Sequence, residues 1–226
     1  MKFGKGQKLV MIGDSITDCE RKRPYGEGLF GGIGKGYVAA VDALLQATYP
    51  DLGLRVINMG TSGDTVRHLK ARWQTDVLDL KPDWLSIMIG INDVWRQYDV
   101  PTIVEEHVYI EEYEATLREL VSRTKPQLSG LVLMTPFYIE SNRSDAMRAT
   151  MDRYGAVVKR VAEEHGAVFV DTQAAFDRTL AHTYAAALAW DRVHPNMAGH
   201  MVIARAFLNA VGFDWNGGDP ASGSNA

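Results

Sequence analysis

The stretch LVMIGDSITD, residues 9–18, joins a short apolar run directly to a polar turn that contains glycine. A near-continuous apolar run of this length is typical of a strand that is buried on both faces of a parallel sheet. Gly13 and Asp14 follow it in a tight turn, which can present the hydroxyl and the backbone N–H of Ser15 at the start of a helix. Ser15 is therefore a candidate nucleophile, although the stretch alone is equally compatible with a helix cap at Ser15 or Asp18.

Four more apolar runs rich in β-branched residues predict further strands, over residues 54–57, 84–89, 131–134 and 167–170. Most of the runs are separated by helix-length segments with apolar residues three and four positions apart, over residues 37–47, 66–80, 108–123, 147–165 and 197–211. Alternating strands and helices predict the α/β class, with an open, doubly wound parallel sheet that is covered by helices on both faces.

Ligands of such sheets bind beyond the carboxyl ends of the strands. Four polar segments punctuated by glycine or proline fall at this edge, namely GDSITD (13–18), NMGTSGDT (58–65), GIND (90–93) and DRVHP (191–195). The sequence therefore predicts that these four distant segments converge on one site.

A serine nucleophile needs a base, and the base needs a carboxylate that orients it. His194 and Asp191 can supply both, because the short loop between them lets one side chain fold back on the other. The alternative for His194 is a solvated histidine in a helix-entry turn.

The oxyanion formed during ester cleavage needs fixed hydrogen-bond donors. The segments offer the backbone N–H groups of Ser15 and Gly63 and the side-chain amide of Asn92. Taken singly, Gly63 is equally well explained as a turn residue with positive φ, and Asn92 as a helix cap. Their joint placement beyond three different strands favours the functional interpretation.

The order Ser15, Gly63, Asn92, Asp191/His194 resembles the four sequence blocks of the GDSL/SGNH hydrolases. Over about residues 1–215, segments such as SIMIGINDVWRQYD and LAWDRVHPNMAGHM are similar to acetylxylan esterases of Gram-positive xylan-degrading bacteria. The resemblance implies a three-layer α/β/α flavodoxin-like fold with a five-stranded parallel sheet. It also implies a serine triad that removes acetyl groups from xylo-oligosaccharides through an acetyl-enzyme, and a homo-oligomer.

Three residues beside these blocks are the expected substrate-binding residues: Asp14, Trp95 and Trp190. An indole can pack its flat face on a sugar ring, although ordinary packing explains Trp95 and Trp190 equally well. The run PFYIESN, residues 136–142, is a further possible wall of the pocket. The nearest alternative function is a lysophospholipase or thioesterase, with the same catalytic residues and a different pocket.

Three other functions fit the sequence less well. GEGLFG at residues 26–31 matches the dinucleotide-binding pattern, but it neither follows a predicted strand directly nor opens a predicted helix. A metallohydrolase would use His194, His200, Asp14 and Asp18, which lack the spacing of zinc proteases. A carbohydrate-binding relic of an esterase should have lost a catalytic block, and none is missing. We therefore expect no metal and no cofactor.

A net charge of −4 over 226 residues offers no basic patch, so neither a nucleic acid nor an anionic membrane is an expected partner. The apolar run before Gly-Asp-Ser, LVMI, is only four residues long, too short for the apolar region of a signal peptide, and the lone Cys19 cannot form an internal disulfide. These features predict a cytoplasmic protein. We expect one domain over residues 1–215 and a disordered polar tail over residues 216–226.

Overall fold

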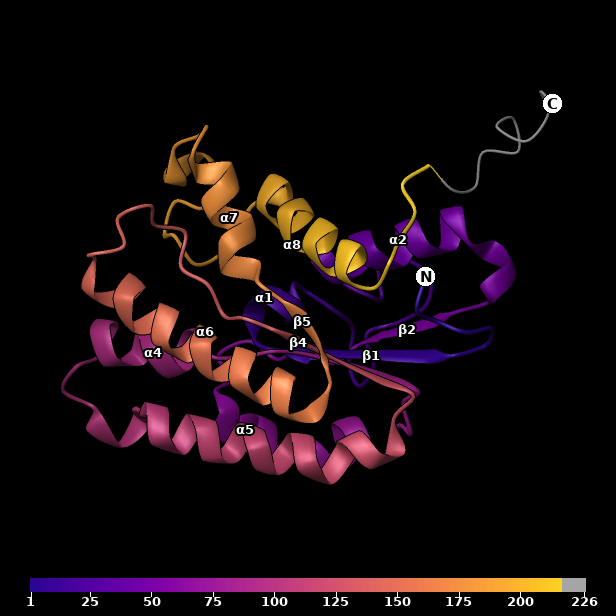
Figure 1. The fold of residues 1–226 in the computed structure, drawn as a ribbon, viewed down its shortest axis with the longest axis horizontal. Coiled ribbons are helices and arrows are strands. Elements are labelled where there is room, and N and C mark those ends of the chain that lie inside the picture. Colours follow the sequence, from indigo (N-terminus) through magenta and orange to yellow (C-terminus); the bar gives the residue numbers. More distant parts are fainter. Residues whose placement is uncertain (217–226) are drawn as a thin grey trace.

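A computed structural model, which describes residues 1–216, contains one five-stranded sheet in the order β2-β1-β3-β4-β5 (Figure 1). All four strand pairings are parallel. The expected five-stranded parallel sheet is thereby confirmed. The strands span Lys8–Gly13 (β1), Arg55–Asn58 (β2), Trp84–Met88 (β3), Gly130–Met134 (β4) and Val168–Val170 (β5).

The strand order places β1 and β3 side by side, with Gly13 of β1 in register with Met88 of β3. The chain leaves β1 toward β2 on one side and returns to β3 on the other, so the two connections diverge at this point. In doubly wound folds a crevice opens at such a switch point, beyond the carboxyl ends of the strands. The segments that follow β1 and β3 carry Ser15 and Asn92.

Helices cover both faces of the sheet, with α2, α7 and α8 on one face and α4, α5 and α6 on the other (Figure 1). The helix α3 packs against α5. Every residue of β3 and β4 is buried, which explains their continuous apolar runs. The helices span Ser15–Asp18 (α1), Tyr37–Thr48 (α2), Val66–Trp73 (α3), Ile91–Asp99 (α4), Ile110–Thr124 (α5), Ala146–His165 (α6), Thr172–Leu180 (α7) and Met197–Ala210 (α8).

Short helical turns complete the chain, with 3₁₀ turns at Pro50–Leu52, Val104–Glu106, Lys125–Gln127 and Ala185–Ala187. The helix predicted over residues 66–80 is an α-helix only as far as Trp73, where α3 ends. The chain then continues as a π-helical turn over Gln74–Leu78. Within residues 1–216, no helix is both long and apolar enough to cross a membrane. Of the expected polar tail, residues 217–226 lie outside the described residues.

Candidate active site

Ser15 is the first residue of α1, directly beyond the carboxyl end of β1. Asp14 caps this short helix, since its Oδ1 accepts the N–H of Ile16 at 3.0 Å. A side chain at Gly13 would place its Cβ only 2.3 Å from the carbonyl oxygen of Met88, so only glycine allows β1 and β3 to approach here. The Gly-Asp pair therefore both closes the turn and exposes Ser15 at the switch point.

The structure brings Ser15, His194 and Asp191 into one line of contacts. The Oγ of Ser15 lies 3.0 Å from Nε2 of His194, and Nδ1 of His194 lies 2.6 Å from Oδ2 of Asp191. A carboxylate can only accept, so Nδ1 must carry the proton that it donates to Asp191. In the neutral imidazole Nε2 is then free to accept the hydroxyl proton of Ser15, as a general base must.

Asp191 is held as a carboxylate by the loop that it begins. Burial alone would raise the pKa of Asp191, but the bond to the His194 ring and the backbone N–H groups of His194 and Val193 hold that pKa below its usual range. Oδ1 accepts these N–H groups at 2.8 and 3.0 Å respectively. Both carboxylate oxygens are therefore used to fix the orientation of the imidazole.

Arg192, between Asp191 and His194, adopts φ of +62°. A residue with a side chain in this left-handed region costs about 1–3 kcal/mol unless its surroundings hold it there. Two contacts do so: the backbone N–H of Ile139 donates to the carbonyl of Arg192 at 2.9 Å, and the guanidinium pairs with Glu140 at 2.7 Å. Residues 139–140 therefore support the loop that carries Asp191 and His194.

Two of the three expected oxyanion donors are backbone N–H groups that are free of hydrogen bonds within the described part of the chain, those of Ser15 and Gly63. Gly63 lies in an exposed loop with φ of +85°, a conformation that strongly favours glycine. A Cβ there would meet no atom within 4 Å, so one side of this residue borders open space. Both N–H groups are available to an incoming oxygen atom.

The amide of Asn92, in the first turn of α4, is fixed by its two neighbours. Its Nδ2 donates to the carbonyl of Asp64 at 2.9 Å, and its Oδ1 accepts from a guanidinium nitrogen of Arg96 at 3.3 Å. Because an arginine can only donate, Arg96 determines which end of the amide is oxygen. Asn92 therefore retains one amide hydrogen that it can give to an oxyanion.

Further contacts join the segments that sequence analysis placed at this edge. The N–H of Thr61 donates to the carbonyl of Gly13 at 3.0 Å, which connects the segment beyond β2 to the serine turn. The ring of Trp95 packs edge-on against His194, with centroids 5.7 Å apart. The four segments thus form one cluster at the switch point.

Replacing Asn92 with alanine should lower kcat by about 10²–10³-fold and leave KM nearly unchanged, since the amide would meet the oxygen only once negative charge has developed on it. Steady-state kinetics on p-nitrophenyl acetate will measure both constants. The isosteric Asn92→Asp, which cannot donate, should lose at least as much. A loss confined to KM would make Asn92 a residue that binds the ester in its ground state.

Two carboxyl groups beneath the site, Asp14 and Asp93, are 1% and 0% exposed. Burial raises the pKa of both to about 7, and the charges of Asp93 and Asp64 add to the rise at Asp14. Oδ1 of Asp93 accepts the N–H of Val66 at 3.0 Å, whereas Oδ2 has no partner within residues 1–216. Compared with the unfolded chain, the folded protein therefore favours the neutral form of both groups.

This burial should make the protein less stable as the pH rises. The pKa of each group is raised in the folded state, so its stabilisation is complete below the ordinary aspartate pKa and is lost as the pH rises through about 7. Between about pH 5 and 8 the free energy of unfolding should fall by about 3 kcal/mol for each group. Asp93→Asn should remove about half of this fall in urea unfolding, and an unchanged slope would exclude Asp93 as its source.

The expected substrate-binding residues differ in exposure. Trp190 is 86% exposed, while Trp95 is half-buried, with the Arg96 guanidinium 4.8 Å from the centre of its indole. Asp14 is enclosed and bonded to α1, so its contacts are those of a helix cap. Direct contact of these three residues with substrate stays a prediction.

A cavity of about 270 Å³ opens beside Gly63 and is lined entirely by polar or charged residues and this glycine. His68 is exposed there, and its Nδ1 accepts the N–H of Thr65 at 3.1 Å. Nδ1 therefore carries no proton, and in the neutral ring Nε2–H is left as a donor. The cavity is lined by Gly63, Thr65, Arg67, His68, Arg96, Glu105 and Glu106.

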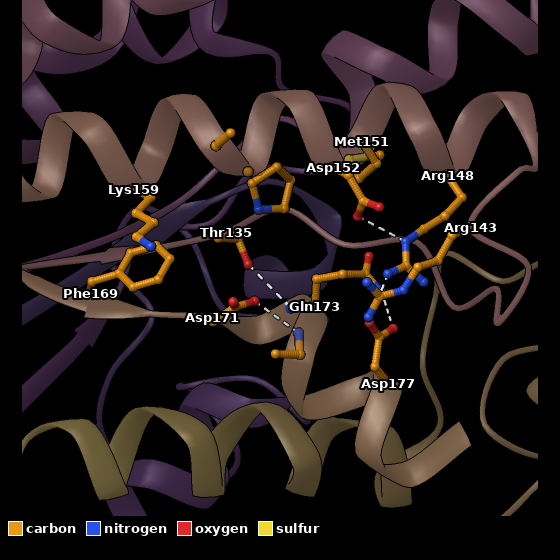
Figure 2. Close-up of a pocket in the computed structure, with 14 residues that line it drawn as sticks. Thr135, Arg143, Arg148, Met151, Asp152, Lys159, Phe169, Asp171, Gln173 and Asp177 are labelled. Carbon is orange, nitrogen blue, oxygen red and sulfur yellow. Dashed lines mark hydrogen bonds and ion pairs between the residues drawn. The ribbon is translucent and has the colours of Figure 1, made fainter. Parts of the chain in front are cut away.

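A second cavity, of about 330 Å³, lies between α6 and α7 (Figure 2). Its buried Arg148 points toward Asp152 and Asp177 and pairs with them at 2.9 and 2.8 Å. These opposite charges satisfy each other. Pro136, from the possible pocket wall at residues 136–142, lines this second cavity, but the candidate catalytic, oxyanion and substrate-binding residues do not.

His200, the other histidine considered for chemistry, is buried, and its ring contacts Tyr37 and Cys19 rather than Ser15. Its Nδ1 accepts the N–H of Tyr37 at 3.1 Å, its Nε2 lies 3.5 Å from Sγ of Cys19, and burial lowers its pKa to about 4. In residues 1–216 no three metal-ligating side chains cluster as a metal site would require. The stretch GEGLFG, residues 26–31, follows α1 and forms a loop without a helix.

Comparison with known proteins shows a family match over most of the chain. The model of the GDSL-like lipase/acylhydrolase family matches residues 11–202. The chain is 66% identical over 215 residues to the acetylxylan esterase of Geobacillus stearothermophilus, a match that covers 95% of this chain and 98% of that protein.

Solved structures give the same result. The crystal structure of Axe2, an acetylxylan esterase from G. stearothermophilus, has a TM-score of 0.94 at 66% identity and covers 95% of this chain and 98% of its own. LAE5, an alpha/beta hydrolase enzyme from the metagenome of Lake Arreo, Spain, has a TM-score of 0.93 at 59% identity, with 94% and 98% covered. Three further structures are catalytic mutants of Axe2, S15A, D191A and H194A.

Proposed function

Because the chain belongs to the GDSL-like lipase/acylhydrolase family and is a serine ester hydrolase, we propose that it removes O-acetyl groups from acetylated xylo-oligosaccharides or xylan. The observation that carries the proposal is the line of contacts from the Oγ of Ser15 through His194 to Asp191. The similarity to a curated acetylxylan esterase over 95% of the chain supports the substrate class.

In the proposed mechanism His194 accepts the hydroxyl proton as Ser15 Oγ forms a bond to the acetyl carbonyl carbon. The tetrahedral intermediate carries its negative charge on the former carbonyl oxygen, and the donors of Ser15, Gly63 and Asn92 stabilise it. The bond to the sugar oxygen then breaks, and His194 returns the proton to that oxygen. The products of this step are the free sugar hydroxyl and an acetyl-enzyme on Ser15.

Water releases the acetate in the second step, with His194 again acting as the base and Asp191 stabilising the imidazolium. The coincidence of Ser15, Asp191 and His194 in type and number with the residues replaced in the catalytic mutants of Axe2 supports these assignments. Apart from the substrate and water, these steps use only groups of the chain itself.

We assign the leaving sugar to the cavity beside Gly63. A sugar ring presents hydroxyl groups in several directions, and the exposed His68 together with the carboxylates of Glu105 and Glu106 offers both donors and acceptors. In the proposed complex, Trp95 and Trp190 supply flat apolar faces next to the catalytic residues. A lysophospholipid would instead require a long apolar wall, and this cavity has none.

The acyl side should admit acetate and little more. With p-nitrophenyl acetate, butyrate and octanoate, kcat/KM should fall steeply as the chain lengthens, because a narrow pocket cannot take extra methylenes without strain. A wide apolar pocket would gain about 0.8 kcal/mol for each buried CH₂ and would give the opposite slope. Acetylated xylo-oligosaccharides should release acetate in the same assays.

Faster hydrolysis of a lysophospholipid or an acyl-thioester than of any sugar ester would overturn the sugar assignment. Such a result would leave the chemistry of Ser15 in place, since lysophospholipase and thioesterase activities would use the same triad on the same fold.

The homo-oligomer implied by the family resemblance is also part of the proposal. Leu29 and Phe30 are 80% and 91% exposed on one loop, and large apolar side chains gathered on a surface are typical of interfaces. Sedimentation velocity of the wild type and of a Leu29→Ser, Phe30→Ser double variant will test this, with a smaller species expected for the variant.

The single domain over residues 1–215 and the cytoplasmic location stay predictions. Cell fractionation will test the cytoplasmic location.

A further inference from the structure

Arg72, in the last turn of α3, is largely buried, with its side chain 16% exposed. Helical side chains tilt toward the helix N-terminus, and that of Arg72 reaches back to the carboxyl ends of β1 and β2. Its guanidinium donates to the carbonyls of Gly13 at 3.0 Å and Met59 at 2.7 Å. It also pairs with the carboxylates of Asp64 at 2.6 Å and Asp76 at 2.7 Å.

Two of these partners are adjacent to the three expected oxyanion donors. Gly13 lies two residues before Ser15, whose N–H is one donor. Asp64 directly follows Gly63, whose N–H is the second, and the carbonyl of Asp64 also holds the amide of Asn92 at 2.9 Å. A single planar group therefore joins the segments of Ser15 and Gly63 directly, and is linked to Asn92 through Asp64.

We propose that Arg72 is a positioning residue that fixes the three oxyanion donors relative to one another. It acts through Gly13 and Asp64 and contacts no reacting atom. The guanidinium suits this task because its donors point outward in a rigid plane, so the spacing between its acceptors is set by covalent geometry. A lysine ammonium is a point charge on a flexible stem and cannot span the same acceptors.

The proposal rests on the proposed hydrolase function, so its test uses p-nitrophenyl acetate, which removes the identity of the sugar from the outcome. Arg72→Gln and Arg72→Lys should each lower kcat by about 10²-fold with KM within about twofold, because displacing catalytic groups by about 1 Å costs this much. Asp76→Asn is the matched control. It removes one ion pair from Arg72 but leaves its bonds to Gly13, Met59 and Asp64.

The control should keep kcat within about twofold of wild type, even if its midpoint of urea unfolding falls as far as that of Arg72→Lys. Circular dichroism and urea unfolding of each variant will show that the compared proteins are folded. An equal loss of kcat in Asp76→Asn and Arg72→Lys would overturn the proposal, because the effect would then follow from weakening the network in general.

A double-mutant cycle of Arg72→Lys with Asn92→Ala distinguishes positioning of the oxyanion donors from a general structural role of Arg72. If Arg72 aligns Asn92 with the other donors, the loss of kcat in the double variant should be well below the product of the two single losses. A loss equal to that product would show that Arg72 acts independently of the oxyanion donors, and the proposal would be wrong. The hydrolysis of acetylated xylo-oligosaccharides tests the substrate assignment, and its outcome is independent of this cycle.

Discussion

Replacement of Ser15 by alanine should lower kcat by about 10⁶-fold, because loss of a serine nucleophile removes the covalent route entirely. The fold should survive. The side chain of Ser15 contacts His194, whereas the cap of α1 comes from Asp14. Acetate release from acetylated xylo-oligosaccharides, together with circular dichroism, will measure both expectations.

Labelling gives an independent control for this assignment. A fluorophosphonate should modify the wild type once, at Ser15, and should not modify the Ser15→Ala variant. Modification of another residue, with loss of activity, would move the nucleophile elsewhere in the chain.

Asp191→Asn should lower kcat by about 10⁴-fold without unfolding the protein. The amide oxygen can still accept the N–H groups of Val193 and His194, so the loop should hold. An amide nitrogen facing the ring would favour the tautomer that carries its proton on Nε2. With a proton already on it, Nε2 of His194 could no longer accept the proton of Ser15.

Asp171→Asn is a suitable control for the same chemical change. Asp171 caps α7, with its Oδ1 accepting the N–H of Ala174 at 2.8 Å, and it takes no part in the triad. This variant should keep wild-type kcat. Retention of kcat by Asp191→Asn as well would show that the carboxylate does not select the tautomer.

The sheet and the site segments could be predicted because both follow from simple local patterns. A strand buried on both faces needs a continuous apolar run, and residues 9–12 and 131–134 have one. The carboxyl ends of parallel strands meet at one edge, so Ser15 and Asn92 had to lie near each other once their strands were found. The family resemblance then specified the chemistry.

Features that depend on tertiary contacts were missed. The helices α4 and α7 were not predicted: α4 begins inside the site segment GIND, and residues 172–180 were assigned to no element. Both helices are short and half of their buried residues are polar, so a search for apolar residues at helical spacing did not find them. Arg72 has the pattern of a surface residue on a helix, and nothing local indicates that its guanidinium contacts β1 and β2. The positive φ of Arg192 is likewise held by Ile139 and Glu140, more than 50 residues away.

Mass spectrometry of the acid-quenched reaction with acetylated xylo-oligosaccharide tests the central claim most directly. The Asp191→Asn variant, whose turnover should be slow, and the wild type are each mixed with substrate, quenched and digested. The peptide that contains Ser15 should carry one acetyl group in at least one of the two proteins, and that group should be absent from Ser15→Ala. Acetate release by the wild type with no acetyl group on this peptide, or with the group on another residue, would contradict the account.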